Sequence, residues 1–298
     1  SYATLSTAYL NALAYTKERV QGADLLQAAD KTAPRVEIIR HPDVRRMLMT
    51  QKAHAEGMRA LVLFTASIQD QVELLGGYKS DKAAEHHRLN DLLLPLCKGY
   101  NSDRCYELLA VSLQCFGGSG YVDDYPMEQY IRDQKIDSLY EGTTHIQALD
   151  LLFRKVARDG GATLRALLGR IQKTVEDEEG GEAFSAERAA LARGLGDIEG
   201  ILMTLMAKMG ESLYHVGLQG NRILFALSEL VIGWLLVRHA VLAERKLEGA
   251  SRKDVAFYQG KIASARYFCG EVLPGLTLTR KLIEKGSLDL MELDDDVF

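Results

Sequence analysis

The sequence is poor in the residues that mark extracellular and metal-binding proteins. Only four cysteines occur among 298 residues, and none lies in a CxxC motif or at a Cys/His metal spacing. We therefore expect buried free thiols and no metal site. Five prolines and little alternation of β-branched residues favour helices over sheet.

An excess of basic charge is also missing. The formal net charge is -5 and the pI is about 5.9, which argues against a nucleic-acid or anionic-membrane surface. We find no uninterrupted apolar run long enough to cross a bilayer, and the first residues do not resemble a signal peptide. These absences predict a cytoplasmic protein without a membrane span.

The start of the chain is itself unusual. Ser1 is not preceded by an initiator methionine, and helical periodicity is already present at Leu5, Ala8 and Ala12. We therefore expect these residues to be the C-terminal part of a longer chain.

Apolar residues at helical spacing predict a helical bundle in the first half of the chain. The first helix should end near Gly22, and an irregular stretch should follow from 23 to 41. A long helix should begin at Pro42 and stop at Gly76 and Gly77. Further helices are expected at about 80–97, 103–116 and after Thr144. Residues 1–158 are thus expected to form an antiparallel bundle.

The second half has a different pattern. Gly160 with Gly161, and the acidic stretch 176–182, are typical of connectors. The apolar stripe that follows predicts another helix; it consists of Leu191, Leu195, Ile198, Leu202, Leu205 and Met209. The methionines Met203, Met206 and Met209 favour core or subunit interface over a cofactor site. We interpret residues 159–298 as a second helical domain with a structural role, and no sheet or repeat is evident, so the fold class is all-α.

The segment from Gln114 to Gln147 carries the chemistry. Gly117, Gly118 and Gly120 allow the backbone to approach a bulky or phosphorylated group. Glu141 lies in a Tyr-Glu-Gly-Thr-Thr turn between two helical stretches. A carboxylate on a loop that rigid helices position is a common general base, although most glutamates are simply surface residues.

Three ordered motifs in the first half of the chain resemble the C-terminal half of the acyl-CoA dehydrogenases. The motifs are Tyr15 to Gly22 (YTKERVQG), Gln114 with the glycine turn to Tyr121, and Arg132 to Ile136 followed by Tyr140 to Gln147. The resemblance covers about residues 1–158. The added helical domain is similar to that of larger bacterial members, but only in architecture.

The resemblance implies FAD-dependent α,β-dehydrogenation of an acyl-CoA thioester in fatty acid β-oxidation. In this family a glutamate removes the pro-R α-proton while hydride passes to flavin N5, which gives the trans-2-enoyl-CoA. Glu141 matches the position of this base. Its backbone N–H is expected to donate to the thioester oxygen. A base that is shielded from water and hydrogen bonds to the developing enolate make this proton transfer feasible.

Further site residues follow from the same resemblance. The positions expected to bind FAD are Arg19, Gln114, Cys115, Phe116, Gly117, Gly118, Thr143, Thr144 and His145. Those expected to face the substrate are Tyr140 and Gly142. Each has a structural alternative as well: a helix-face arginine, a helix C-cap, an N-capping threonine, a packed tyrosine. None of the histidines has a partner at metal spacing, so no metal is assigned.

The sequence departs from the family pattern near its start. No phenylalanine separates Gln21 from Gly22, and about a dozen extra residues precede the long helix. His41 and Pro42 stand where small members carry Phe-Gln. These differences affect the expected details of FAD binding more than the assignment of Glu141.

The family resemblance also implies partners. An N-terminal helical domain and a β-domain are expected to complete the active site, and FAD contacts across subunits imply a homodimer or tetramer. An electron-transferring flavoprotein is the expected electron acceptor. Two alternatives stay open: a relative of the acyl-CoA oxidases that uses oxygen, and a helical assembly module without turnover.

Overall fold

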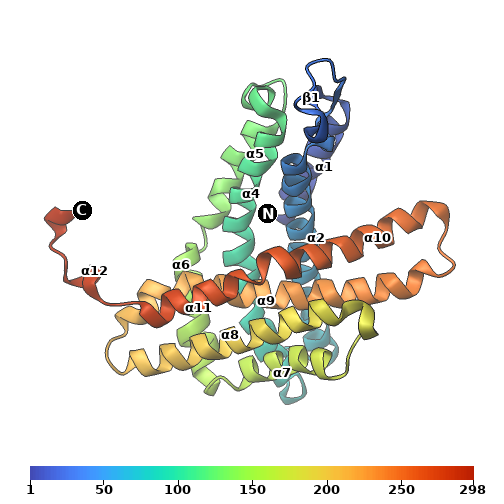
Figure 1. The fold of residues 1–298 in the computed structure, drawn as a ribbon. Helices are drawn as coiled ribbons and strands as arrows, with labels where there is room; N and C mark the ends of the chain where they lie inside the picture. Colours follow the sequence, from blue (N-terminus) through green and yellow to red (C-terminus); the bar gives the residue numbers. More distant parts are fainter. The chain divides into compact units, whose positions relative to one another are not determined.

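The computed structural model describes residues 1–298, and nearly every element is a helix (Figure 1). This confirms the all-α fold class. The chain forms two compact units, residues 1–59 with 101–140 and residues 60–100 with 141–298. The domain boundary expected near residue 158 stays a prediction, since the two units divide the chain at other positions. Each unit is described by itself.

The first unit is built around α1 (Tyr2–Glu18), α4 (Asn101–Phe116) and α5 (Met127–Gln134). It also contains the first half of α2 (Pro42–Leu74). Its short helices are η1 (Leu25–Gln27), η2 (Ile38–Arg40), η5 (Gly117–Tyr121) and η6 (Lys135–Ser138). The apolar spacing read from the sequence is used as expected, because Leu5, Ala8 and Ala12 of α1 are all fully buried. α2 and α4 share a buried polar link, in which Ser112 Oγ donates to Gln51 Oε1.

A small hairpin corrects the expectation that the chain has no sheet. Strands β1 (Val20–Ala23) and β2 (Arg35–Glu37) pair antiparallel, with Val20 opposite Glu37 and Ala23 opposite Arg35. The first helix accordingly ends at Glu18, before Gly22. Gly22 has a φ of +73° and lies where the register shifts. Strands of three and four residues are too short for a two-residue period to be visible in the sequence.

The second unit begins with the end of α2 and continues through η3 (Asp81–Ala83), α3 (Ala84–Pro95) and the π-turn η4 (Leu96–Tyr100). The rest of it starts at residue 141. Its helices are α6 (Thr144–Leu149), the π-turn η7 (Asp150–Val156), η8 (Ala157–Asp159), α7 (Ala162–Glu176), η9 (Gly181–Phe184), α8 (Ser185–Met209), α9 (Tyr214–Leu247), α10 (Arg252–Tyr267), the π-turn η10 (Phe268–Val272), α11 (Gly275–Lys285), α12 (Asp289–Glu292) and η11 (Asp295–Val297).

Helix α9 is the centre of the second unit. It packs against α6, α8, α10 and α11, and Figure 1 shows α8, α9 and α10 running alongside one another. An 18-residue window of α9 has a mean hydropathy of 1.6, so the helix is long and apolar enough to cross a membrane, which the sequence reading overlooked. However, 83% of that window is buried in the structure. The apolar composition of α9 is therefore used by the core.

Other expectations for this unit are mostly confirmed. Leu191, Leu195 and Ile198 are buried, and Gly160 and Gly161 both have positive φ at a connector. Of the methionines expected in the core or at a subunit interface, Met203 and Met206 are 70% and 75% exposed and do not belong to the core; the interface alternative stays a prediction.

The cysteines are free thiols, as expected. Cys105, Cys115 and Cys269 are buried and Cys97 is half-buried. Burial raises the pKa of Cys97 to about 11 and that of Cys105 to about 12, so both thiols stay protonated near neutral pH.

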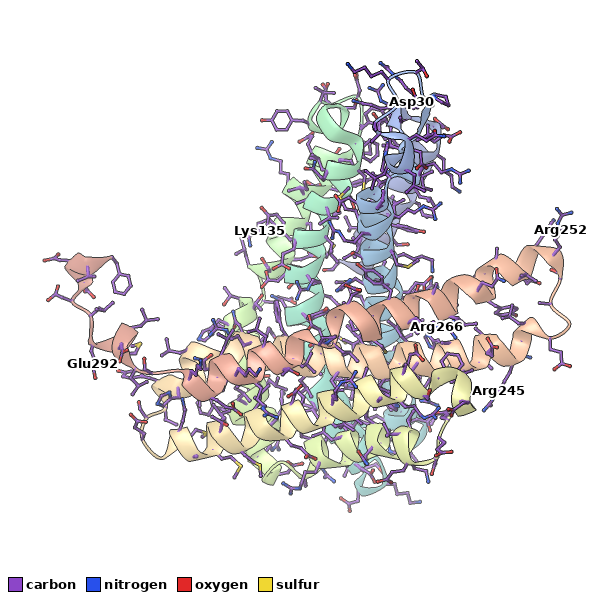
Figure 2. The ribbon with its side chains drawn as sticks, viewed as in Figure 1. Asp30, Lys135, Arg245, Arg252, Arg266 and Glu292 are labelled. Atoms are coloured by element: carbon purple, nitrogen blue, oxygen red, sulfur yellow. The ribbon has the colours of Figure 1, made fainter.

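Several charged side chains of the second unit are exposed. Arg245 and Arg252 lie near the connection between α9 and α10, and Glu292 lies on the C-terminal segment, which extends away from the helices before it (Figure 2). No group of three His, Cys, Asp or Glu residues is arranged to hold a metal.

Two glycines inside α8 provide a test of this packing. A Cβ at the exposed Gly196 meets nothing, whereas one at the buried Gly194 would lie 3.0 Å from Leu230 Cδ1. Both alanine variants gain the same helix propensity, about 0.5–1 kcal/mol. We expect Gly196→Ala to raise the free energy of unfolding by this amount and Gly194→Ala to be less stable than Gly196→Ala by about 1–3 kcal/mol. Equal denaturant midpoints for the two variants would contradict the described packing of α8 on α9.

Candidate functional site

The turn that carries Glu141 has an unusual backbone. Glu141 has a φ of +54° and Gly142 has a φ of +89°, so two consecutive residues are left-handed. Only one other non-glycine residue in the chain, Glu178, has a positive φ. This conformation is strained for a residue with a Cβ, and such strain is frequent where a side chain has to be aimed.

Two side chains of the second unit hold this turn. Lys98, in η4, donates from Nζ to the carbonyl oxygen of Gly142. Gln147, in α6, donates from Nε2 to the carbonyl oxygen of Glu141 at 3.0 Å. The carbonyl oxygens of both Glu141 and Gly142 therefore accept a hydrogen bond. The carboxylate of Glu141 is exposed and makes no hydrogen bond or ion pair, and its backbone N–H has no partner.

The residues after the turn begin helix α6. Thr143 is its N-cap, and its hydroxyl accepts from the backbone N–H of Ile146 at 3.4 Å. Thr144 is buried, and its hydroxyl has no hydrogen-bond partner. His145 is half-buried, with Nδ1 3.3 Å from Asn221 Oδ1 in α9. A buried hydroxyl without a partner is uncommon in proteins.

In the first unit, three neighbouring glycines have three different roles. Gly117 has a φ of +58°, so the backbone conformation favours glycine there. A Cβ at Gly120 would lie 2.8 Å from Phe116 Cβ and 2.9 Å from the carbonyl oxygen of Leu113, so packing requires it. Gly118 has neither constraint, because its φ is not positive and a Cβ there would meet nothing within 4 Å. The space above Gly118 is open to an incoming group.

An aromatic cluster fixes this glycine turn. The Phe116 ring stacks on Tyr15 of α1 with the ring centroids 4.5 Å apart, and Tyr125 packs against both rings. Tyr15 Oη also donates to Ser119 Oγ at 3.3 Å. The side chains of Phe116 and Cys115 belong to the core, so these two residues can offer a ligand only backbone atoms.

Two exposed polar residues lie at the same end of the first unit. Gln114 is exposed on the last turn of α4, and its side chain makes no hydrogen bond. Arg19 follows the end of α1, one helical turn beyond Tyr15, and the only partner of its guanidinium is Gln21 Oε1 at 3.5 Å. Since Tyr15 packs on the glycine turn, Arg19 and the glycines share one end of the α1–α4 pair. The predicted cofactor residues of this unit are thus brought together.

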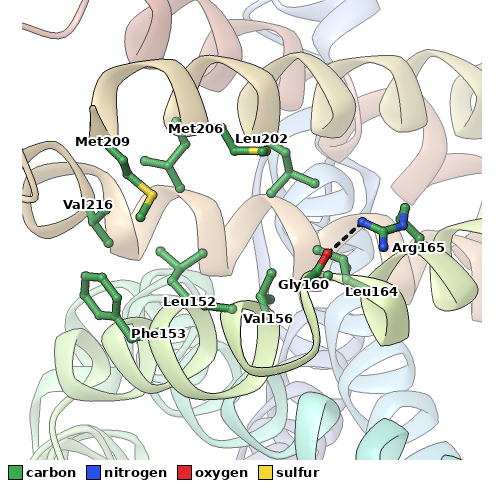
Figure 3. Close-up of a pocket in the computed structure, with 13 residues that line it drawn as sticks. Leu152, Phe153, Val156, Gly160, Leu164, Arg165, Leu202, Met206, Met209 and Val216 are labelled. Atoms are coloured by element: carbon green, nitrogen blue, oxygen red, sulfur yellow. Dashed lines mark hydrogen bonds between the residues drawn. The ribbon is translucent and has the colours of Figure 1, made fainter. Parts of the chain in front are cut away.

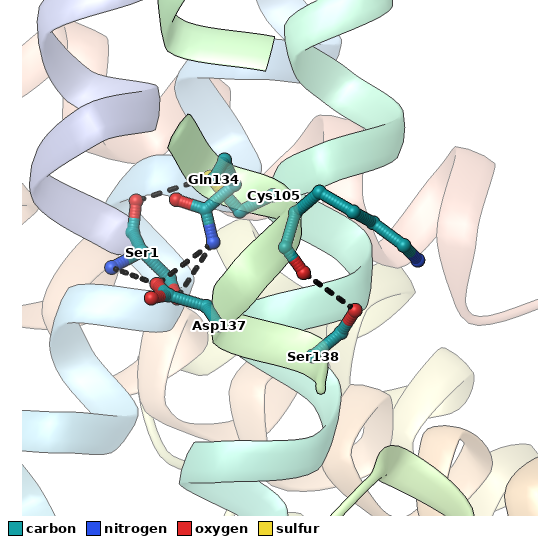
Figure 4. A network of polar contacts seen from close by, with 6 residues as sticks. Ser1, Cys105, Gln134, Asp137 and Ser138 are labelled. Carbon is teal, nitrogen blue, oxygen red and sulfur yellow. Dashed lines mark hydrogen bonds and ion pairs between the residues drawn. The ribbon is translucent and has the colours of Figure 1, made fainter. Parts of the chain in front are cut away.

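The middle motif is structural. Gln134 is buried and donates from Nε2 to Asp137 Oδ2 at 2.9 Å and to Ser1 Oγ at 3.0 Å (Figure 4). Cys105 Sγ donates to the carbonyl oxygen of Ser1, so the network joins α4, α5 and the start of α1. This arrangement explains why a glutamine is needed at 134 without assigning it a ligand.

The predicted residues therefore form two groups, one in each unit. The group in the second unit is the left-handed turn itself, Glu141 and Gly142, and the three residues that follow it, Thr143, Thr144 and His145. Arg19, Gln114 and the glycine turn form the group in the first unit. The half-exposed Tyr140 belongs to the same unit but not to this group, because it follows η6, whose Asp137 contacts Ser1 at the other end of α1. Sequence reasoning missed the roles of Lys98 and Gln147. Gln147 belongs to a recognised motif, whereas nothing in the sequence distinguishes Lys98 from a surface lysine.

Comparison with protein families gives two matches that together cover most of the chain. The family described as "Acyl-CoA dehydrogenase, C-terminal domain" matches residues 3–155, and the family described as "Acetyl-CoA dehydrogenase C-terminal like" matches residues 167–294.

Sequence relatives are acyl-CoA dehydrogenases by name. A broad-specificity linear acyl-CoA dehydrogenase of Mycobacterium tuberculosis is 52% identical over 99% of this chain and 49% of that protein. A 3-methylmercaptopropionyl-CoA dehydrogenase of Ruegeria pomeroyi is 36% identical over 89% of this chain and 44% of that protein. The chain thus spans about half the length of the relatives it matches.

Solved structures share the fold. An acyl-CoA dehydrogenase from Bacillus anthracis in complex with FAD has a TM-score of 0.71 at 18% identity, over 99% of this chain and 48% of that one. ACDH-11 of Caenorhabditis elegans in complex with C11-CoA has a TM-score of 0.70 at 19% identity, over 91% of this chain and 41% of that one.

Proposed function

Because the chain belongs to the acyl-CoA dehydrogenase family, we propose that it supplies the catalytic base and part of the FAD site for α,β-dehydrogenation of an acyl-CoA thioester. Glu141 is the proposed base. The observation that carries the proposal is the left-handed turn, which presents a carboxylate without partners beside a backbone N–H without a partner.

The carboxylate and the backbone N–H of Glu141 have complementary tasks. The carboxylate of Glu141 accepts the α-proton of the thioester. Negative charge then develops on the thioester oxygen, and the N–H of Glu141 can donate a hydrogen bond to it. Donors that are already oriented toward developing charge are among the largest contributions to catalysis. Lys98 and Gln147 keep the two carbonyl oxygens of the turn turned away from this position, because both oxygens accept hydrogen bonds elsewhere.

The base also has to be shielded from water. In this chain Glu141 is exposed, and an exposed carboxylate is too weak a base for a thioester α-proton. We propose that further segments of the protein cover the turn, which agrees with a chain that spans about half the length of its relatives. Tyr140, whose side chain is 52% exposed, and Gly142 are the proposed contacts for the substrate beside the base.

The residues of both units fit FAD. When bound, FAD supplies the acceptor for the β-hydride. Gly118 leaves open space for close approach of a bulky group, and the Arg19 guanidinium carries a charge suited to a diphosphate. In the second unit, the Thr144 hydroxyl is buried without a partner and His145 borders it in sequence. We propose Arg19, Gln114, the backbone from Cys115 to Gly118, and Thr143 to His145 as the FAD contacts.

For the electron acceptor we propose an electron-transferring flavoprotein. The relatives with sequence identity of 30% or more are named as dehydrogenases, including the one at 52%. Solved structures of acyl-CoA oxidases resemble this chain in fold at 14–16% identity. A likeness at that level does not indicate how electrons leave the flavin.

Replacing the proposed base is the first test. In the flavin-loaded protein, we expect Glu141→Gln to slow substrate-dependent loss of the flavin's visible absorbance by roughly 10²- to 10⁴-fold, because the amide cannot accept the α-proton. The matched control is Glu178→Gln, which changes the only other non-glycine residue with positive φ and should leave the rate unchanged. Flavin reduction at the normal rate in Glu141→Gln would remove Glu141 from the mechanism.

The open space at Gly118 gives a second test. We expect Gly118→Ala to leave the thermal unfolding midpoint of the flavin-free protein unchanged, since the added methyl meets nothing in the chain. Its Kd for FAD, measured by flavin fluorescence, should rise about tenfold or more, because the methyl occupies the space of the ligand. Gly120→Ala should instead lower the unfolding midpoint. If Gly118→Ala binds FAD normally, the proposed contact is wrong.

The third test concerns the acceptor. During turnover in air, we expect hydrogen peroxide to account for only a small part of the enoyl-CoA formed, whereas added electron-transferring flavoprotein should be reduced in proportion to product. One peroxide per enoyl-CoA would instead identify an oxidase.

A further inference from the structure

The second unit contains an apolar trough that the proposed active site does not use. It has a volume of about 290 Å³ and lies between α8 on one side and η7, η8 and the start of α7 on the other (Figure 3). Its lining is almost wholly apolar; the side chains that define it are Leu152, Phe153, Val156, Leu202, Met206 and Met209. Pockets of this size with few polar groups are typical small-molecule sites.

The trough is elongated and its two ends differ. Figure 3 shows Phe153, Met209 and Val216 at one end and Arg165 at the other. Along α8 the lining runs from Leu202 to Met209, seven steps along the helix, which corresponds to about 10 Å at 1.5 Å per residue. A straight alkyl chain of medium length fits such a shape better than a ring system.

The polar end has one positive charge. Arg165 Nη1 donates to the carbonyl oxygen of Gly160 at 2.8 Å, and Arg165 forms no ion pair. The nearby Asp159 carboxylate accepts from Thr163 instead. A guanidinium has five N–H donors, so one hydrogen bond leaves the others available. A single guanidinium matches a monoanion, and its planar shape suits a carboxylate.

The walls of the trough are adaptable. Met206 is 75% exposed and Phe153 is 39% exposed, so these side chains can close over an occupant. Methionine side chains adjust to ligands of varying shape because they are flexible and polarisable. A smaller apolar cavity of about 10 Å³ adjoins the same wall at Leu152, Val156 and Leu202.

We propose that this trough binds a medium-chain fatty carboxylate, with the alkyl chain along Met206 and Met209 and the carboxylate at Arg165. The site is separate from the turn that carries Glu141, and it requires a free carboxylate. A CoA thioester has no charge at that end of the chain and is therefore a poor ligand for it.

Direct binding tests the proposal. In the purified protein with methyl-labelled methionine, titration with decanoate should shift the methyl signals of Met206 and Met209 saturably and leave that of Met203 unchanged. Decanol should bind about tenfold more weakly than decanoate, because it cannot form the charged hydrogen bonds. Decanoyl-CoA should produce no such shifts in Met206 or Met209. Glu141→Gln should bind decanoate normally, so the outcome is independent of the proposed dehydrogenation.

Two pairs of variants separate the trough from general effects. Arg165→Gln should abolish the preference for decanoate over decanol, while Arg170→Gln, which makes the same charge change elsewhere on α7, should retain it. Met206→Trp should fill the trough and prevent binding, and Met203→Trp, at an equally exposed position of α8 outside the lining, should not.

Three outcomes would overturn the proposal: no saturable shift with decanoate, an unchanged preference in Arg165→Gln, or Met206 shifts that follow protein concentration alone. The last result would mean that a second copy of the chain covers the trough.

Discussion

The proposed chemistry depends on one backbone constraint, the left-handed conformation of Glu141 and Gly142. A glutamate with positive φ has a cost in conformational energy, so its neighbours must favour it over the relaxed alternatives. Here Lys98 and Gln147 bind the two carbonyl oxygens, and Thr143 caps the helix that follows. These contacts come from η4 and α6, which both pack on α9. The direction of the carboxylate and the free N–H beside it are therefore properties of the helical core rather than of a flexible loop.

The sequence was sufficient for most of the helical architecture. Long stretches with a regular apolar period, such as α2 and α8, can be predicted as helices because the period extends over many turns. The hairpin at Val20–Ala23 was missed because its strands are shorter than the pattern that would identify them. The π-turns at 96–100 and 150–156 were also invisible, since they preserve helical character while shifting the phase of the buried face. Side-chain exposure at Met206 depends on which neighbours cover the helix, and a single helix does not encode that.

The candidate site was predictable to a similar extent. The glycine turn and the Glu141 turn were located by motif, but the motif treats Gly117, Gly118 and Gly120 alike. Only the structure separates them, since one is favoured by backbone conformation, one is required by packing and one has neither constraint. A residue whose side chain binds the backbone of a distant segment has little sequence signal. Lys98 is such a residue, because any nearby donor of the right length could bind the Gly142 carbonyl, and its partner is 44 residues away.

The helical residues from Thr144 to Asp159 connect the Glu141 turn with the trough, which raises the question of whether the two sites influence each other. A ligand changes a distant site only when it binds two conformations with different affinity. The lining of the trough begins at Leu152, about two helical turns beyond the cap at Thr143, and the contacts that hold the turn come from Lys98 and Gln147 instead. None of the residues that hold the turn lines the trough. We therefore treat them as two separate sites on one helical frame: the turn is proposed to set the geometry of proton abstraction, and the trough is proposed to bind a free carboxylate.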